Sequence, residues 1–369
     1  MARGGSESRL DPGAFPEPTT VEAVAPNLKR RLSGVTSTLE RVVPVQARSL
    51  RIAALGPKLA AGVPRISWTD LRHFWRPPPG RPARIWHARR NIEMLTGLIL
   101  RDLLRMKLRL VFTSASQRHH TGWTRFLISR MDAVISTSAK TATYLRRPST
   151  VIHHGIDADM FRPPESRASA RAALGLPDLT LIGCFGRIRA QKGTDVFVEA
   201  LIRLLPDHPG WGGVVLGRAL AKDAGFLDDL KAKVAAAGLQ DRLLFPSEVE
   251  TSATPDWYRA LDLYVAPQRW EGFGVTPIEA MACGVPVIAT RVGAFEELVK
   301  EGVTGALVPP GDIEAMTAAL RAHLALDDDA RAAMAARARA HAVSTFSLER
   351  EAAKINAVYE AVWDVARRG

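Results

Sequence analysis

The stretch from Trp270 to Thr290 constrains the fold more than any other part of this chain. Two glycines flank Phe273, and Thr276-Pro277 is typical of a helix start, where proline removes no needed hydrogen bond. Gly284 marks the end of that helix, and the apolar run Val285–Thr290 is typical of a buried parallel strand. The stretch therefore predicts a loop, a short helix and a strand of an α/β fold.

Two carboxylates bracket the junction between this loop and this helix. Glu271 lies in the loop, and Glu279 lies on the first helical turn, where free N–H groups and the helix dipole favour an anion. A capping box with Thr276 would explain Glu279 without a ligand, and solvation would explain Glu271. From this stretch alone, both alternatives stay open.

A second glycine-bounded loop lies upstream. The apolar run Leu179–Phe185 predicts a strand, the loop Gly186–Gly193 follows it, and a helix with one apolar face comes next. A loop between a strand and a helix is where α/β sheets bind phosphate, and Arg187 and Lys192 lie near its two ends. A solvated basic loop is the alternative.

Together these motifs resemble the retaining nucleotide-sugar glycosyltransferases of family 4. The resemblance covers most of residues 178–315, and it implies an α/β fold of the GT-B type, with two Rossmann-like domains whose parallel sheets face each other across a cleft. The motifs that carry it are Gly186-Arg187, Lys192-Gly193, Pro267, Glu271-Gly-Phe-Gly, Glu279 to Ala289, Gly293, Glu296-Glu297-Leu and Gly302 to Pro309.

The resemblance implies a role for each site residue. Arg187 and Lys192 would stabilise the charge that develops on the leaving diphosphate. Glu279 would bind the ribose hydroxyls, and Glu271 would bind hydroxyls of the transferred sugar at the catalytic centre. Further contacts to the donor are implied for Gly34, Gly272, Phe273, Gly274 and Val275.

The sequence shows no cluster of residues with the spacing of metal ligands. We therefore predict a metal-independent transferase without a cofactor, as is usual for enzymes of the GT-B type. Glycosidase chemistry needs two carboxyl groups about 5–9 Å apart, but the cationic loop would have no role in a hydrolase. The retained anomeric configuration follows from the resemblance alone.

Positive charge is concentrated in the first part of the chain. Residues 1–150 carry 26 Lys and Arg against 9 Asp and Glu, a net charge of +17, whereas residues 151–369 have a net charge of −5. This asymmetry implies an anionic partner, which could be nucleic acid, an acidic membrane surface or a negatively charged acceptor.

Two segments of the basic half offer candidate surfaces. The loop around His119, His120 and Trp123 suits an acceptor pocket for an anionic sugar, and the resemblance places His120 near the reacting sugar; an ordinary surface pair is the alternative. Residues 94–112 interleave apolar residues with arginine and lysine. A core helix, turn and strand would explain this pattern, and a basic surface lying on an anionic bilayer is the alternative.

The length of 369 residues predicts two domains. We expect a disordered leader at 1–26, an acceptor-binding domain at 27–163 completed by a crossover helix at 347–369, and a nucleotide-sugar-binding domain at 164–346. Two cysteines in apolar contexts and the lack of a long apolar run favour a reduced, cytosolic protein.

The basic half also resembles lipopolysaccharide-core mannosyltransferases, at 32–38 and 112–122. This resemblance implies transfer of mannose from GDP-mannose to Kdo, a sugar acid, on a lipid A precursor, with peripheral contact at the cytoplasmic face of the inner membrane. One alternative is a family 4 enzyme that uses UDP-glucose or UDP-galactose, or another anionic glycolipid acceptor. A more distant alternative is a non-enzymatic module that binds nucleic acid or an anionic surface.

Overall fold

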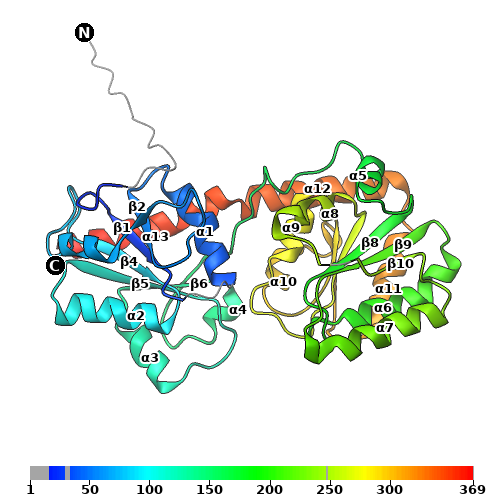
Figure 1. The fold of residues 1–369 in the computed structure, drawn as a ribbon, viewed down its shortest axis with the longest axis horizontal. Coiled ribbons are helices and arrows are strands. Elements are labelled where there is room, and N and C mark those ends of the chain that lie inside the picture. Colours follow the sequence, from blue (N-terminus) through cyan, green and yellow to red (C-terminus); the bar gives the residue numbers. More distant parts are fainter. Residues whose placement is uncertain (1–15, 30–33, 247, 369) are drawn as a thin grey trace, which may run out of the picture. The chain divides into compact units, whose positions relative to one another are not determined.

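The computed structural model describes residues 16–29, 34–246 and 248–368. The chain forms two compact units. The first unit combines the chain up to Gly155 with the chain from Leu348 onward, and the second unit is Ile156–Ser347. Each unit is a parallel sheet with helices on both faces (Figure 1).

The sheet of the first unit has the strand order β3-β2-β1-β4-β5-β6-β7, and its neighbouring strands pair in parallel. From β1, the strands β2 and β3 extend the sheet toward one edge. The strands β4 to β7 lie on the other side of β1 and extend the sheet toward the opposite edge. The strands are β1 (Ala23–Pro26), β2 (Ile52–Leu55), β3 (Arg65–Ile66), β4 (Arg84–Ala88), β5 (Leu108–Ser114), β6 (Ala133–Ser136) and β7 (Thr150–Val151).

Helices cover both faces of this sheet because successive strand side chains point to opposite faces. Val24 packs with the helices α2 and α3, whereas Ala23 and Ala25 pack with α1 and α13. The helices are α1 (Gly34–Gln46), α2 (Asn91–Leu98), α3 (Gly122–Ser129), α4 (Ala139–Ala142) and α13 (Leu348–Arg368), with a 3-10 helix at Trp68–His73 and a π-helix at Ile99–Leu103.

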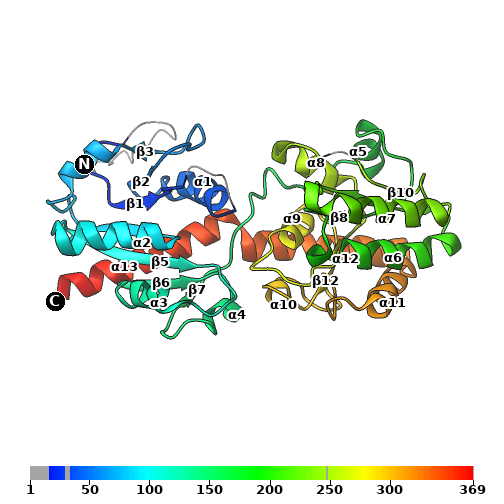
Figure 2. The same ribbon diagram turned by 60° about the horizontal axis from the view of Figure 1, so that its bottom comes forward.

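The last helix, α13, belongs to the core of the first unit and runs along its sheet (Figure 2). Tyr359 and Trp363 are fully buried there. The hydroxyl of Tyr359 lies 2.6 Å from Nδ1 of His87, and the indole N–H of Trp363 donates to the carbonyl of Ala83 at 2.8 Å. The first unit is therefore built from two distant parts of the sequence.

The second unit has the strand order β10-β9-β8-β11-β12-β13, again parallel. Its strands are β8 (Thr180–Phe185), β9 (Trp211–Leu216), β10 (Leu243–Leu244), β11 (Leu263–Ala266), β12 (Val287–Thr290) and β13 (Gly305–Val308). Helices α6 (Thr194–Leu204), α7 (Ala224–Ala236) and α11 (Ile313–Leu324) pack on one face, and α8 (Thr254–Arg259), α9 (Thr276–Ala282), α10 (Phe295–Leu298) and α12 (Asp328–Phe346) pack on the other. The remaining helices are α5 (Arg167–Ala173) and 3-10 turns at Ala190–Lys192, Leu205–Asp207, Ala221–Asp223 and Thr251–Ala253.

The predicted loop, helix and strand at 270–290 are confirmed by α9 and β12. Gly284 has a φ of +70°, and the N–H of Val285 donates to the carbonyl of Ala280 at 3.0 Å, which satisfies the end of the helix. The capping-box alternative is wrong, because the N-cap residue is Val275 and no side chain caps the helix. The carboxylate of Glu279 therefore does not cap the N-terminus of α9.

The structure corrects two expectations about the chain's organisation. The leader predicted for 1–26 is wrong at its end, since Ala23–Pro26 forms the buried strand β1. The predicted boundary at 163 is also wrong, because the compact units divide after Gly155. Residues 30–33, which include the start of the stretch at 32–38, lie outside the described residues.

The segment 94–112 is partly buried and partly exposed, so the predicted core helix, turn and strand are confirmed, and contact with a bilayer stays a prediction. Met94, Leu100 and Leu110 are buried in the core of the first unit. Leu103, by contrast, has 73% of its surface exposed, and Leu104 has 42% exposed. The π-helix at Ile99–Leu103 explains the split, because its wider turn breaks the 3.6-residue period and rotates apolar side chains out of the buried face.

Both cysteines are buried and free. Burial raises the pKa of the thiols of Cys184 and Cys283 to about 12. They therefore pack as small apolar side chains. No helix in the described part of the chain is long and apolar enough to cross a bilayer.

Candidate active site

A pocket of about 300 Å³ lies at the carboxyl ends of the strands of the second unit. Two of the predicted site residues, Arg187 and Glu279, line it, whereas Lys192 and Glu271 do not. Its other lining residues come from the ends of β8 and β9, the segment after β10, and the helices α8 and α9; they are Phe185, Gly186, Leu216, Gly217, Arg218, Glu248, Val249, Thr254, Tyr258 and Thr276.

The position of this pocket follows from the sheet topology. After β8 the chain adds β9 and β10 on one side, and it then returns to add β11, β12 and β13 on the other side. The loops that leave β8 and β11 therefore diverge, and a crevice opens at the carboxyl ends of the strands between them. Open α/β sheets bind their ligands at this point.

Arg187 follows β8 at a place where two loops come unusually close. A Cβ atom on Gly217 would lie 1.8 Å from the carbonyl oxygen of Gly186, so only glycine fits there. The guanidinium of Arg187 makes no hydrogen bond or ion pair with any described residue. It is a free cation at the edge of the pocket, as a phosphate ligand requires.

Lys192 and Glu271 form an ion pair. The Nζ atom of Lys192 lies 2.5 Å from Oε2 of Glu271, and the side chains are only 23% and 19% exposed. Oε1 of Glu271 accepts a hydrogen bond from the N–H of Gly272 at 3.0 Å. The cationic loop after β8 and the acidic loop before α9 thus meet in the folded second unit.

Residues 272–275, for which contacts to the donor are predicted, directly follow Glu271 of this ion pair in the sequence. Gly274 has a φ of +85°, and a Cβ atom there would lie 2.3 Å from the ring of Phe295 and 2.8 Å from Cγ of Glu271. The side chain of Phe273 is buried in the core, so its backbone alone is available to a ligand. Because Gly274 has no side chain, Glu271 can pack closely against the backbone of this loop.

The other two predicted site residues belong to the first unit. His120 lies in the loop between β5 and α3 and lines a separate small cavity there. Gly34 is the first residue of α1, and no atom lies within 4 Å of a Cβ atom built on it. Their roles toward a donor or a reacting sugar stay predictions.

Comparison with known proteins decides the family. The crystal structure of Anabaena HepE in complex with UDP aligns with a TM-score of 0.78 at 20% identity, over 92% of this chain and 100% of that one, which shows the GT-B fold. Residues 166–341 match the family model of glycosyl transferases group 1. The lipopolysaccharide core biosynthesis mannosyltransferase LpsB of Rhizobium meliloti is 57% identical over 347 residues, 93% of this chain and 98% of LpsB.

The chain belongs to the group 1 glycosyltransferases. A second relative, the lipopolysaccharide core biosynthesis mannosyltransferase LpcC of Rhizobium leguminosarum bv. viciae, is 51% identical over 94% of this chain and 98% of LpcC. This glycosyltransferase is therefore an enzyme that transfers a hexose from a nucleotide-sugar donor. The alternative of a non-enzymatic binding module is wrong.

Sequence reasoning missed several residues of the glycosyltransferase pocket, among them Arg218 and Tyr258. Arg218 follows Gly217 at the end of β9, as Arg187 follows Gly186 at the end of β8, and this repeated Gly-Arg after a strand was a usable signal. Tyr258 gave no signal, because its contact with Glu279 joins residues from two different helices.

Tyr258 positions the acid of this pocket. It is fully buried, and its hydroxyl donates a hydrogen bond to Oε2 of Glu279 at 3.1 Å. Burial raises the pKa of Tyr258 well above its usual value, with smaller contributions from Tyr264 and Glu279, so the hydroxyl stays protonated and remains a donor. The carboxylate is therefore fixed before any ligand arrives.

Tyr258→Phe should raise the KM for the donor about tenfold, the typical effect of losing one hydrogen bond to a charged group. The turnover number should change less, because Glu279 contacts the donor away from the breaking bond in the predicted arrangement. Steady-state kinetics with varied donor would measure both values. A mutant with an unchanged KM would show that the hydrogen bond does not position Glu279.

Arg269 holds in place the loop Gly186–Gly193, which carries Arg187 and Lys192. Its guanidinium makes two hydrogen bonds of 2.7 Å to the carboxylate of Asp195 at the start of α6, and it also contacts the carbonyl of Ala190 at 2.5 Å. The N–H of Arg269 donates to the carbonyl of Gln191 at 3.0 Å. Hydrogen bonds of Arg269 thus connect the segment before Glu271 to the turn Ala190–Lys192.

Arg269→Lys should therefore lower kcat/KM about tenfold although the charge is kept, because lysine cannot make the planar two-point contact. Asp195→Asn should have a similar effect through the same contact. The measurement is kcat/KM for both single mutants and for the double mutant. Additive losses in the double mutant would contradict a shared clamp.

Within the described residues, no group of three or more His, Cys, Asp and Glu side chains lies close enough to hold a metal ion. Nδ1 of His154 lies 3.1 Å from Oε1 of Glu351 on α13. Metal independence of the glycosyltransferase stays a prediction.

Proposed function

We propose that this glycosyltransferase transfers mannose from GDP-mannose to Kdo on a lipid A precursor, with retention of the anomeric configuration, in lipopolysaccharide core biosynthesis. One observation carries the proposal: the full-length relatives LpsB and LpcC, at 57% and 51% identity, are named lipopolysaccharide core biosynthesis mannosyltransferases. The aligned stretches span 93% and 94% of this chain, so they include most of the basic first unit, where the acceptor would bind.

The proposed reaction breaks the bond between the anomeric carbon of mannose and the distal phosphate oxygen of GDP-mannose. A new bond forms between that carbon and a hydroxyl oxygen of the acceptor, and the hydroxyl proton goes to the departing phosphate. Negative charge grows on the distal phosphate as its bond to the sugar breaks, before the proton arrives there. Arg187, which has no described partner, and Lys192 would stabilise that charge, and no metal ion is needed for the proposed chemistry.

The two acids would hold the donor's hydroxyl groups. Glu279 lines the pocket beside Tyr258 and would accept hydrogen bonds from the two ribose hydroxyls. Glu271 is held by Lys192 and by the N–H of Gly272, and it would accept hydrogen bonds from the mannose hydroxyls. A carboxylate suits both tasks because it accepts several hydrogen bonds and needs to donate none.

We further propose that the enzyme is cytoplasmic and rests peripherally on the inner membrane through an exposed apolar patch of the first unit. Trp75, Ile99, Leu103 and Leu104 form this patch, with exposed fractions of 49%, 42%, 73% and 42%. The indole N–H of Trp75 donates to the carbonyl of Leu104 at 2.8 Å, which joins the two segments. The basic residues Arg76, Arg105 and Lys107 follow in sequence and suit anionic lipid headgroups.

The proposed function can be tested by incubating the purified enzyme with GDP-[¹⁴C]mannose and a Kdo-bearing lipid A precursor. Labelled mannose should appear in the lipid, and NMR of the product should show the retained anomer. In parallel reactions, UDP-glucose or UDP-galactose replaces GDP-mannose. A further reaction with GDP-mannose contains EDTA, which removes metal ions. Turnover of a UDP-sugar without turnover of GDP-mannose would disprove the donor, and loss of activity with EDTA would disprove metal independence.

A further inference from the structure

A small cavity in the first unit is lined by three arginines and by no acid. It has a volume of about 70 Å³ and lies between α3 and the segment that follows α4. Arg125 and Ser129 lie one turn apart on the same face of α3. The other polar lining residues are His120, Tyr144, Arg146 and Arg147.

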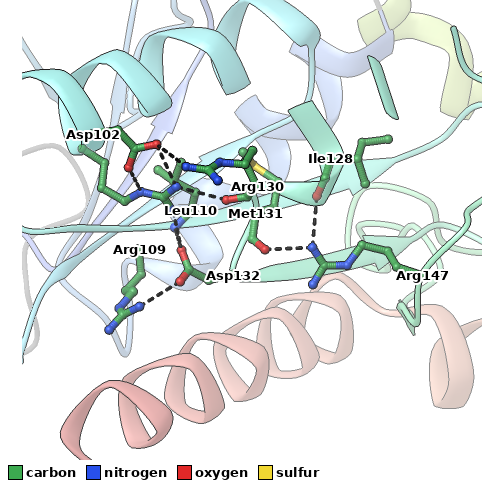
Figure 3. Close-up of polar contacts among 9 residues, drawn as sticks. Asp102, Arg109, Leu110, Ile128, Arg130, Met131, Asp132 and Arg147 are labelled. Carbon is green, nitrogen blue, oxygen red and sulfur yellow. Dashed lines mark hydrogen bonds and ion pairs between the residues drawn. The ribbon is translucent and has the colours of Figure 1, made fainter. Parts of the chain in front are cut away.

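The charges of these arginines are not neutralised within the described structure. The side chains of Arg125 and Arg146 make no hydrogen bond or ion pair with any described residue. Arg147 donates to the carbonyl oxygens of Ile128 and Met131 at 3.0 and 2.8 Å (Figure 3), and these neutral acceptors fix the guanidinium without cancelling its charge. Three positive charges around one cavity attract an anion to it.

A neighbouring group of arginines shows the usual solution to this problem. Arg101 contacts both Asp102 and Asp132, at 2.7 and 3.0 Å. Arg109 also pairs with Asp132 at 3.0 Å (Figure 3). Arg130, at the end of α3, lies 3.6 Å from Asp102. Asp102 and Asp132 therefore pair with Arg101, Arg109 and Arg130, whereas the residues that line the cavity include arginines but no acid.

His120 adds a polar atom that needs a partner. Its Nε2 atom is shielded from solvent and has no hydrogen-bond partner in the described part of the chain. Burial lowers the pKa of His120, with smaller contributions from Arg118 and His119, so the ring is neutral near pH 7 and one of its nitrogens can donate a hydrogen bond.

We propose that this cavity binds an anionic oxygen group, a carboxylate or a phosphate, of the glycolipid acceptor. The proposal rests on the proposed function and gives the acceptor a specific point of recognition. The volume of about 70 Å³ is far below the roughly 300–1,000 Å³ of pockets that enclose whole ligands. It suits one charged group, and the guanidinium forks of Arg125 and Arg146 match the geometry of its oxygens.

The main test replaces the two exposed arginines and measures the acceptor. Arg125→Gln combined with Arg146→Gln should raise the KM for the Kdo-bearing acceptor about 10- to 100-fold, the range for losing hydrogen bonds between charged groups. The KM for GDP-mannose should stay the same. Arg130→Gln is the control: it removes one arginine charge at the C-terminal end of α3 but does not line the cavity, and its KM values should equal those of wild type.

Modified acceptors identify the bound group. One acceptor has its Kdo carboxylates methyl-esterified, and another lacks the lipid A phosphates. The modification that removes the group bound in the cavity should raise the KM of wild type and leave the KM of the double mutant unchanged. If the double mutant keeps the wild-type KM, or if it remains as sensitive as wild type to both modifications, the proposal is wrong.

A binding experiment separates this proposal from the proposed function. Calorimetric titration of the full-length wild type with free Kdo and with inorganic phosphate should show binding of one or both anions, and the double mutant should show none. If mannose transfer is not observed with any acceptor, the proposed function fails while this titration still decides the cavity. Absence of binding of both anions to wild type would overturn the anion site itself.

Discussion

Lys192→Ala should lower the turnover number about 100- to 1,000-fold, the usual effect of removing one group that stabilises charge in a transition state. Two losses combine in this mutant. The leaving diphosphate loses a cation, and Glu271, whose side chain is only 19% exposed, loses the partner that lies 2.5 Å away. The KM for the donor should rise less than the turnover number falls, because the charge on the phosphate grows as the bond breaks.

Single-turnover kinetics of Lys192→Ala, Glu271→Gln and the double mutant would test this result. Because the two side chains form one ion pair, the double mutant should be little slower than the slower single mutant. Arg203→Ala is a matched control, since this cation lies later on α6 and pairs with the exposed Glu314. Near-wild-type turnover of Lys192→Ala would remove the pair from the mechanism.

Gly193→Ala should destabilise the second unit by about 2–4 kcal/mol, because it combines a strained backbone with a steric clash. Gly193 has a φ of +70°, and a Cβ atom there would lie 1.8 Å from the carbonyl oxygen of Pro267. The loop can accept the methyl group only by moving away from Pro267. Lys192 would move with it, so activity should fall together with stability.

Differential scanning calorimetry should show a decrease of roughly 4–16 °C in the unfolding temperature of the Gly193→Ala second unit, from the scaling for domains of this size. Gly225→Ala provides a control of opposite sign. Gly225 lies in α7, a Cβ atom added to it would meet no other atom within 4 Å, and alanine favours a helix by about 0.5–1 kcal/mol. An unchanged unfolding temperature for Gly193→Ala would contradict the close approach of the two loops.

The second unit could be predicted well because its signals are local. The strand before Gly186, the helix from Thr194 and the end of α9 at Gly284 each follow from a run of apolar residues ended by glycine or proline. The sequence also indicated that Lys192 and Glu271 could act on one ligand. Their direct ion pair depends on the packing of β8 beside β11, which no local pattern encodes.

The first unit was harder because its elements are short and its contacts are distant. Four residues, Ala23–Pro26, form a buried strand directly after a stretch rich in proline and glutamate, so composition gave the wrong answer. The exposure of Leu103 depends on a π-helix, which apolar periodicity does not predict. The proposed anion cavity joins Arg125 on α3 with Arg146 and Arg147 in the segment after α4, and sequence spacing alone could not bring them together.

The place of α13 in the first unit has a consequence for biosynthesis. The ribosome makes residues 156–347 without interruption, so the second unit can fold while synthesis continues. The first unit, although its sheet is translated earlier, lacks Tyr359 and Trp363 until the codons that follow those of the second unit are read. The sheet that is synthesised first is thus covered only after the whole second unit has been made, and until then it exposes an apolar face that chaperones can bind.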